Sequence, residues 1–126
     1  MAGTLTISTL SDGTNSTSST NCIQGSAKAW VLFNGISGAV VRGSYNVSSV
    51  TRNGTGQYTV TLTNAIADAN GASVANAVEA NSFSSLGNFN NFCNSALTST
   101  TTVIIGSADV GNAYQDQGYI SLAVFR

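Results

Sequence analysis

The sequence predicts an all-β fold: a small antiparallel β-sandwich or barrel of roughly six to eight strands with an extended N-terminal arm. Three observations support this. β-Branched and aromatic residues recur in short runs along the 126 residues, as strands require. Ser, Thr, Asn and 13 Gly separate the runs and supply the turns, because the chain has no Pro. The chain length suits a single domain.

Residues 1–21 are the predicted arm and polar linker, and residues 22–126 the β domain. In residues 1–10, apolar side chains alternate with Thr and Ser, which favours a strand with one apolar face. Residues 11–21 read as a low-complexity linker with an Asp-Gly turn. A strand on such a linker is well placed to dock on a neighbouring protein. The candidate anchoring residues are Leu5, Ile7 and Leu10.

The strongest apolar run is residues 27–33, AKAWVLF, in which both faces of a strand would be apolar. In a chain this small, we expect another subunit to cover the second apolar face of this strand. The C-terminal run, residues 118–126, also has two apolar faces, one of them formed by Ile120, Leu122 and Val124. The candidate subunit-interface residues are Trp30, Phe33, Leu122, Val124 and Phe125.

Between these runs the pattern predicts further strands. Residues 34–38 form a turn, and residues 39–50 form one strand or two. Asn53-Gly54 is typical of a primed hairpin turn. Residues 57–63, QYTVTLT, alternate and place Tyr58, Val60 and Leu62 inward, and residues 101–106 resemble a strand.

Residues 64–98 are ambiguous. Their alanines support a short helix around residues 72–80, whereas the many Asn residues favour a loop. The segment FNNF is a candidate to fold back on the core through Phe89 and Phe92.

The charge pattern excludes several classes of partner. With four basic and five acidic residues and no basic cluster, the chain lacks the footprint of a nucleic-acid binder or of a protein bound to an anionic membrane surface. No apolar stretch is long enough to span a bilayer, and residues 1–10 do not resemble a secretory signal. The expected location is therefore a cytoplasm, or a larger particle assembled there. A net charge of −1 also favours self-association.

Catalytic chemistry has little to use, and the chain is expected not to be an enzyme. There is no His to act as a general base. Lys28, beside Trp30, is expected to pack along apolar surface. Asp109 and Asp116 are the only close pair of acids, in a segment that reads as a polar loop and not as a catalytic pair. A calcium site using Asp68, Asn70 or Asp109 is a minor alternative.

The two cysteines, Cys22 and Cys93, are expected to be small buried hydrophobes, with a disulfide as the alternative. The absence of His and of a C-x-x-C motif argues against a metal site, and no cofactor is expected.

Arg42 and Arg52 are candidates to pair with Asp68 or Glu79 across a subunit boundary. Tyr114 and Tyr119, beside the polar loop that contains Asp109 and Asp116, are the candidates for contact with a glycan.

A more specific pattern covers roughly residues 26–70 and 118–126. AKAWVLFNG is followed by RGSYNVSSV, then by GTGQYTV, and the last strand contains AVF. Together these segments resemble a β-module that recurs in bacteriophage tail-fibre and head-decoration proteins. The resemblance implies a structural virion protein that self-associates, commonly as a homotrimer, and that contacts other virion proteins such as the major capsid or tail proteins. The alternative is a tail-fibre tip that recognises host cell-surface glycans.

Overall fold

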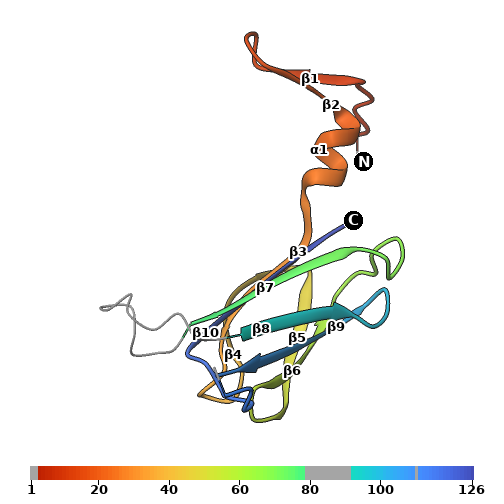
Figure 1. The fold of residues 1–126 in the computed structure, drawn as a ribbon. Helices are drawn as coiled ribbons and strands as arrows, with labels where there is room; N and C mark the ends of the chain where they lie inside the picture. Colours follow the sequence, from red (N-terminus) through yellow and green to blue (C-terminus); the bar gives the residue numbers. More distant parts are fainter. Residues whose placement is uncertain (1–2, 79–91, 110) are drawn as a thin grey trace.

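The computed structural model describes residues 3–78, 92–109 and 111–126. It confirms the all-β fold: two four-stranded antiparallel sheets pack face to face as a sandwich, and a small hairpin and one helix precede them (Figure 1). The elements in chain order are β1 (Thr9–Ser11), β2 (Ser16–Ser18), α1 (Ser19–Gly25), β3 (Ala27–Asn34), β4 (Val40–Tyr45), β5 (Val47–Gly54), β6 (Gln57–Leu62), β7 (Ala72–Val78), β8 (Phe92–Leu97), β9 (Thr102–Ala108) and β10 (Tyr119–Phe125).

The core lies between the sheet ordered β4-β3-β10-β7 and the sheet ordered β5-β6-β9-β8. Alternate residues of each strand point inward, because successive side chains in a strand face opposite sides. The inward directions predicted for Tyr58, Val60 and Leu62 are confirmed, since these side chains are buried. The other buried apolar residues are Ala29, Val31, Phe33, Ala39, Ile66, Ala77, Val103, Ile105, Ile120, Leu122 and Val124.

Asn46 separates two strands in the stretch of residues 39–50, for which the sequence allowed one strand or two. Its φ of 55° turns the chain sharply, so that β4 belongs to one sheet and β5 to the other. Its side-chain Nδ2 donates to the carbonyl of Lys28 at 3.0 Å, and its Oδ1 accepts from the amide of Asn64 at 2.8 Å. Asn tolerates this backbone region better than most residues, and here its amide also ties the two sheets together.

The hairpin predicted near Asn53-Gly54 is present between β5 and β6, but its turn lies two residues later. Gly54 pairs with Gln57, and the positive φ, 65°, belongs to Gly56. The reason is the crowding of the turn against β9: the amide of Ser107 donates to the Gly56 carbonyl at 2.7 Å. A Cβ at Gly56 would overlap the Ser107 carbonyl oxygen, so only glycine fits there.

Residues 72–78 form a strand, so both the helix and the loop considered for this stretch are wrong. β7 pairs with β10 along its whole length, from Ala72 opposite Phe125 to Val78 opposite Tyr119. This pairing outweighs the modest helix preference of its alanines. Phe92 begins β8 with 56% of its surface exposed, so it does not fold onto the core. Phe89 lies outside the described residues.

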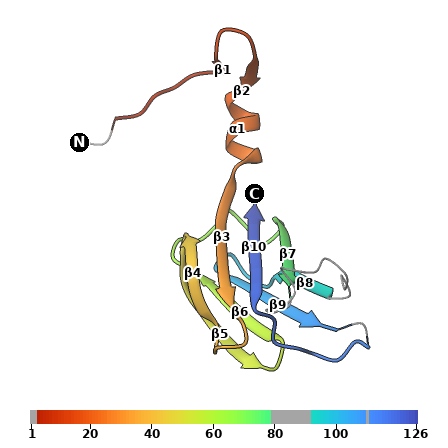
Figure 2. The same cartoon turned by 90° about the vertical axis from the view of Figure 1, so that its left-hand side faces the viewer.

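The N-terminal arm, residues 3–26, is more structured than predicted. The polar linker expected over residues 11–21 contains the end of β1, the β1–β2 turn, all of β2 and the start of α1. Of the strand expected within residues 1–10, residues 4–8 form no strand. The Ser18 Oγ caps the helix by accepting from the amide of Asn21 at 3.2 Å. The Lys28 Nζ donates to the carbonyl of Ile23 and to the Ser26 Oγ at the end of the helix. In Figure 2 the arm projects from one end of the sandwich.

Candidate interaction surfaces

An apolar row crosses the outer face of the β4-β3-β10-β7 sheet. Strand register places one residue from each strand side by side: Tyr45, Trp30, Ala123 and Val74. Trp30 is 44% exposed and Val74 is 61% exposed. The indole of Trp30 lies over Gly43, where an added Cβ would sit 3.5 Å from the ring. This row, called here the outer row, is the type of apolar surface that marks an interaction site.

Beside the outer row is a shallow pocket of about 310 Å³. Its lining residues are Leu32, Asn76, Val78, Tyr119 and Ser121. Arg42 lies at its border, with its guanidinium carbon 4.2 Å from the centre of the Tyr119 ring. The cation therefore stacks on an aromatic face, so the pocket combines apolar side chains with one positive charge at its border.

Burial corrects the predicted subunit interface. Phe33 is 0% exposed, Leu122 3% and Val124 0%. These three side chains fill the core between the two sheets, so a second subunit cannot reach them. The second sheet of the same chain covers these residues, whereas the sequence predicted that a neighbouring subunit would cover them. Trp30 and Phe125 remain as candidates, because both belong to the outer face of the sheet.

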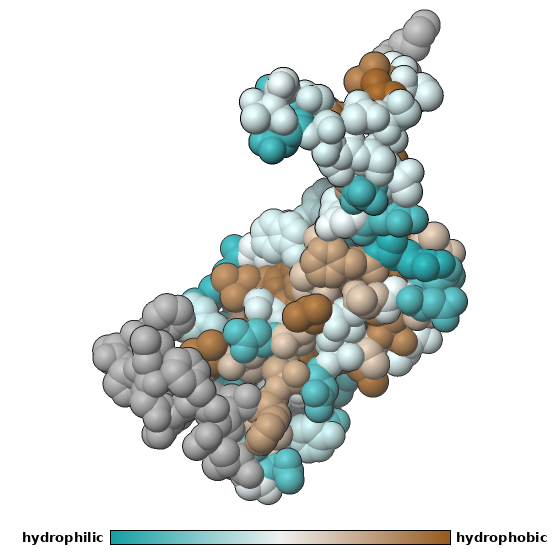
Figure 3. All heavy atoms as spheres, turned by 45° about the horizontal axis from the view of Figure 1, so that its top comes forward, coloured by the Kyte–Doolittle hydropathy of each residue, from teal (hydrophilic) through white to brown (hydrophobic). Residues whose placement is uncertain are grey.

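The arm holds an unsupported apolar cluster. Leu5, Ile7 and Leu10, the three candidate anchoring residues, lie around a cleft of about 370 Å³ together with Cys22 and Ile23. Leu5 is 82% exposed and Ile23 is 64% exposed. Apolar side chains are visible on the arm and in patches across the sandwich (Figure 3).

Helix α1 depends on contacts beyond itself. It has 7 residues and none of them is buried, whereas an isolated helix of that length is marginal in water. Sequence reasoning missed this helix, although two weak signals mark it: Ser18 as a possible cap and Gly25 at its end. The arm therefore combines an exposed apolar cluster with a short helix that has no buried residue.

The two tyrosines proposed for glycan contact lie on different sheets. Tyr114, 56% exposed, borders an open groove of about 510 Å³ on the outer side of β8 and β9, where its ring lies near Gly106. Phe92, Asn94 and Asn112 line the same groove. Tyr119 instead borders the pocket beside the outer row. The structure therefore retains Tyr114 at this site and excludes Tyr119 from it.

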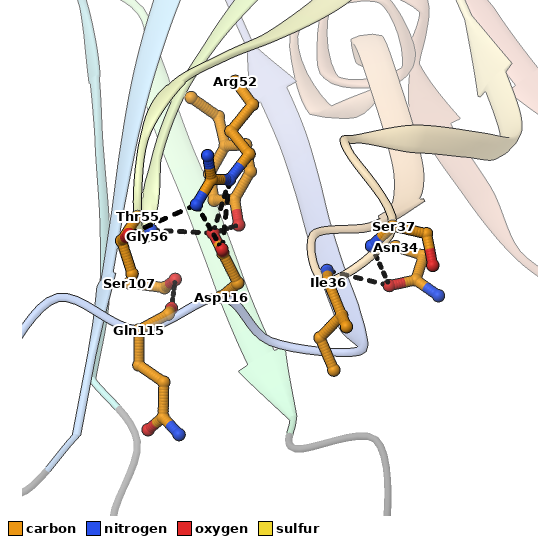
Figure 4. A network of polar contacts seen from close by, with 10 residues as sticks. Asn34, Ile36, Ser37, Arg52, Thr55, Gly56, Ser107, Gln115 and Asp116 are labelled. Atoms are coloured by element: carbon orange, nitrogen blue, oxygen red, sulfur yellow. Dashed lines mark hydrogen bonds and ion pairs between the residues drawn. The ribbon is translucent and has the colours of Figure 1, made fainter.

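A polar network that the sequence did not reveal fixes the loop before β10 (Figure 4). Asp116 accepts from the Arg52 Nη2 at 2.6 Å, from the Gly56 amide at 2.8 Å and from the Tyr58 hydroxyl at 2.5 Å. The Arg52 hydrogen bonds lower the pKa of Asp116 from 3.8 to about 2, with help from Tyr58 and Gly56. Burial, and then the neighbouring carboxylate, raise the pKa of Tyr58.

This network corrects the predicted ion pairs. Arg52 pairs with Asp116 of its own chain, and Asp68 pairs with Arg126. Glu79 lies outside the described residues. Asp109 has a separate structural role, since its Oδ1 accepts from the amides of Gly111 and Ala113 at 2.8 and 3.0 Å. Asp109 and Asp116 therefore both stabilise the connection between β9 and β10, each through different hydrogen-bond partners.

The cysteines are both free and half-buried. Burial raises the pKa of Cys93 to about 11, which makes it a poor nucleophile near neutral pH.

Among residues 3–78, 92–109 and 111–126, no cluster of three acidic or Cys side chains has the arrangement of a metal site. No helix in these same segments has the length and apolarity to cross a bilayer. Comparison with known protein families, curated proteins and solved structures finds no match.

Proposed function

We propose that this chain is a structural protein of a bacteriophage particle and has no enzymatic role. It is a self-associating surface component, a capsid decoration (cement) protein or a short fibre, that attaches to the particle through its N-terminal arm. Its partners are copies of itself, with a homotrimer implied by the sequence resemblance, and other virion proteins such as the major capsid or tail proteins.

The observation that supports this proposal best is the composition of the arm. Leu5, Leu10 and Ile23 are each more than half exposed, although burying one such side chain contributes about 1.5–3 kcal/mol. A hairpin and a 7-residue helix have no core of their own to stabilise them. An element built in this way gains its stability where it docks.

The outer row provides a second surface for assembly. It presents exposed aromatic and aliphatic side chains on a rigid sheet, and aromatic anchors contribute most of the binding energy in many interfaces. The low charge of the chain means that identical copies meet with little repulsion.

Attachment is tested with a chain lacking residues 2–25 and with a full-length chain carrying Leu5→Ser, Ile7→Ser and Leu10→Ser. Both are mixed with particles depleted of the protein, and bound protein is measured by co-sedimentation. Both variants should lose attachment at least ten-fold while the sandwich stays folded by circular dichroism. A matched control, Thr4→Ser with Thr6→Ser, should bind normally. Full occupancy by the truncated chain would contradict the proposal.

A second candidate function, recognition of host glycans, is favoured by the groove on β8 and β9. The exposed rings of Phe92 and Tyr114 lie with the amides of Asn94 and Asn112 around one open surface. Sugars stack on aromatic faces and exchange hydrogen bonds with amides. Binding to a glycan array should fall with Tyr114→Ala and persist with Tyr119→Ala, because Tyr119 lies on the other sheet. Equal loss in both variants, or no binding by the wild type, would argue against this site.

A further inference from the structure

We infer that residues 4–8 of one copy add as an extra strand to the free edge of β4 in a neighbouring copy. This inference rests on the proposed self-association. It gives residues 4–8 to a neighbouring copy and leaves the rest of the arm, with the exposed Leu10 and Ile23, to contact the particle. It arises from two features of the same chain that match each other: an extended segment with a strand pattern and an apolar sheet edge.

The donor segment alternates Thr4, Leu5, Thr6, Ile7 and Ser8 but pairs with no strand among the described residues. Its backbone is tied to the rest of the arm at Ser8, whose carbonyl accepts a hydrogen bond from the amide of Ser19 at 2.9 Å. Leu5 is 82% exposed. In Figure 2 the chain before β1 runs sideways from the arm and does not touch its own sandwich. A neighbouring copy is therefore the natural recipient.

The acceptor is β4, the outermost strand of its sheet. Within the described part of the chain, β4 forms strand pairs with β3 alone. Val40 is 55% exposed and Val41 is 41% exposed. An exposed apolar edge of this kind is a template for pairing with another chain, and Figure 2 shows β4 at the margin of the sheet.

The other sheet edges suit a donor strand less well. β7 and β8, the edges on the opposite side of the sandwich, lie against one another. β5 has register shifts at two places along its pairing with β6, whereas β4 has one along its pairing with β3. Each strand carries one Arg: that of β5 forms an ion pair with Asp116, and that of β4 stacks on the ring of Tyr119. Irregularity and charge both protect an edge from strand addition.

The apolar side of residues 4–8 can also lie on the same side of the sheet as the apolar Val41 of β4. Val41 pairs with the buried Phe33 and so lies toward the core side of the sheet. An added strand with Leu5 and Ile7 on that side would cover Val41 and extend the core, with its threonines directed to solvent. Five residues span about 17 Å, so the donor can pair along most of the 6-residue β4, which is about 20 Å long. The donor carries no charge, and backbone pairing supplies affinity while the alternate side chains set the register.

The test uses full-length chains with Cys22→Ser and Cys93→Ser, so that only introduced thiols react. One chain carries Val41→Cys and a size tag. It is co-expressed with an untagged chain carrying Leu5→Cys, Ile7→Cys or, as the control, Thr6→Cys. After mild oxidation, mixed disulfides are measured on a non-reducing gel. We expect at least a five-fold higher yield from position 5 or 7 than from position 6, because a one-residue shift reverses the face.

Equal yields at positions 5, 6 and 7, or no mixed disulfide in chains that still associate, would overturn the strand addition. The second result would direct the arm to a different virion protein, whereas chains that do not associate at all would overturn the proposed function itself. A second measurement avoids the cysteine substitutions. Val41→Lys should weaken self-association at least ten-fold, and Ile36→Lys, in an exposed turn, should leave it unchanged; the same affinity in both variants would also overturn the inference.

Discussion

Arg52 and Asp116, 64 positions apart in sequence, form a bidentate ion pair that fastens the loop before β10 to the β5–β6 hairpin. The Arg52 Nε donates to both carboxylate oxygens of Asp116, at 3.1 Å to Oδ1 and 3.0 Å to Oδ2, and its Nη2 donates to Oδ2 at 2.6 Å. Oδ1 also accepts from the Gly56 amide and the Tyr58 hydroxyl. One aspartate thus joins a hairpin tip, a core tyrosine and the connection between β9 and β10.

Replacing this carboxylate should destabilise the sandwich. Asp116→Asn removes the charge that Arg52 and Tyr58 both engage, and the loss of hydrogen bonds to a charged group costs about 1.5–3 kcal/mol. Urea unfolding followed by tryptophan fluorescence measures the change. The control is Asp109→Asn, whose carboxylate serves an exposed turn, and it should cost clearly less. Equal effects would mean that the network contributes little beyond local loop structure.

The same carboxylate predicts how stability depends on pH. The pKa of Asp116 is lowered from 3.8 to about 2 in the folded chain, so its contribution is complete above about pH 4. That contribution is lost as the pH falls toward 2, because the unfolded chain binds the proton first. Unfolding midpoints of the wild type and Asp116→Asn should therefore converge between pH 4 and 2. A constant gap across that range would contradict the lowered pKa.

Two glycines of one hairpin should respond differently to alanine. Gly56 has a φ of 65°, and a Cβ there would overlap the carbonyl oxygen of Ser107. Gly54 has nothing within 4 Å of the corresponding position. We expect Gly56→Ala to cost about 1–3 kcal/mol and Gly54→Ala to be close to neutral, both measured by thermal unfolding. Similar melting temperatures would show that the turn relaxes freely.

The two faces of β3 should separate assembly from folding. Trp30→Lys alters an exposed residue of the outer row, so the chain should stay folded while self-association weakens at least ten-fold. Phe33→Ala removes a fully buried ring and should cost about 3–5 kcal/mol of stability. Circular dichroism and light scattering distinguish the two effects. A Trp30→Lys chain that associates normally would remove the outer row from the interface.

Much of the fold follows from local pattern. The alternation in residues 57–63 predicts both the strand and its buried face, because a period-two sequence with one apolar face has few alternatives. In residues 118–126, where both faces are apolar, the alternation predicts the strand but not which face is buried. The alternation does not say which element covers each face. Phe33, Leu122 and Val124 were assigned to a subunit interface for this reason, whereas the second sheet of the same chain covers them.

Other features depend on contacts that no local pattern reveals. Residues 72–78 become a strand through pairing with β10, against the helix preference of their alanines. Asp116 lies in a segment that reads as a polar loop, and its partner Arg52 is in a distant hairpin. Of the candidate sites, Leu5, Ile7 and Leu10 were predicted together and lie around one cleft, because sequence neighbours stay close whatever the fold. Tyr114 and Tyr119 were also paired by sequence proximity, and the turn between β9 and β10 places them on different sheets.

The central claim, that this protein assembles through exposed apolar surfaces, is tested most directly by its mass in solution. Sedimentation velocity of the purified full-length chain should give a species of about three times 12.8 kDa at micromolar concentrations, shifting toward the monomer when Trp30→Lys is combined with removal of residues 2–25. A single 12.8-kDa species at every concentration up to the millimolar range would contradict the account.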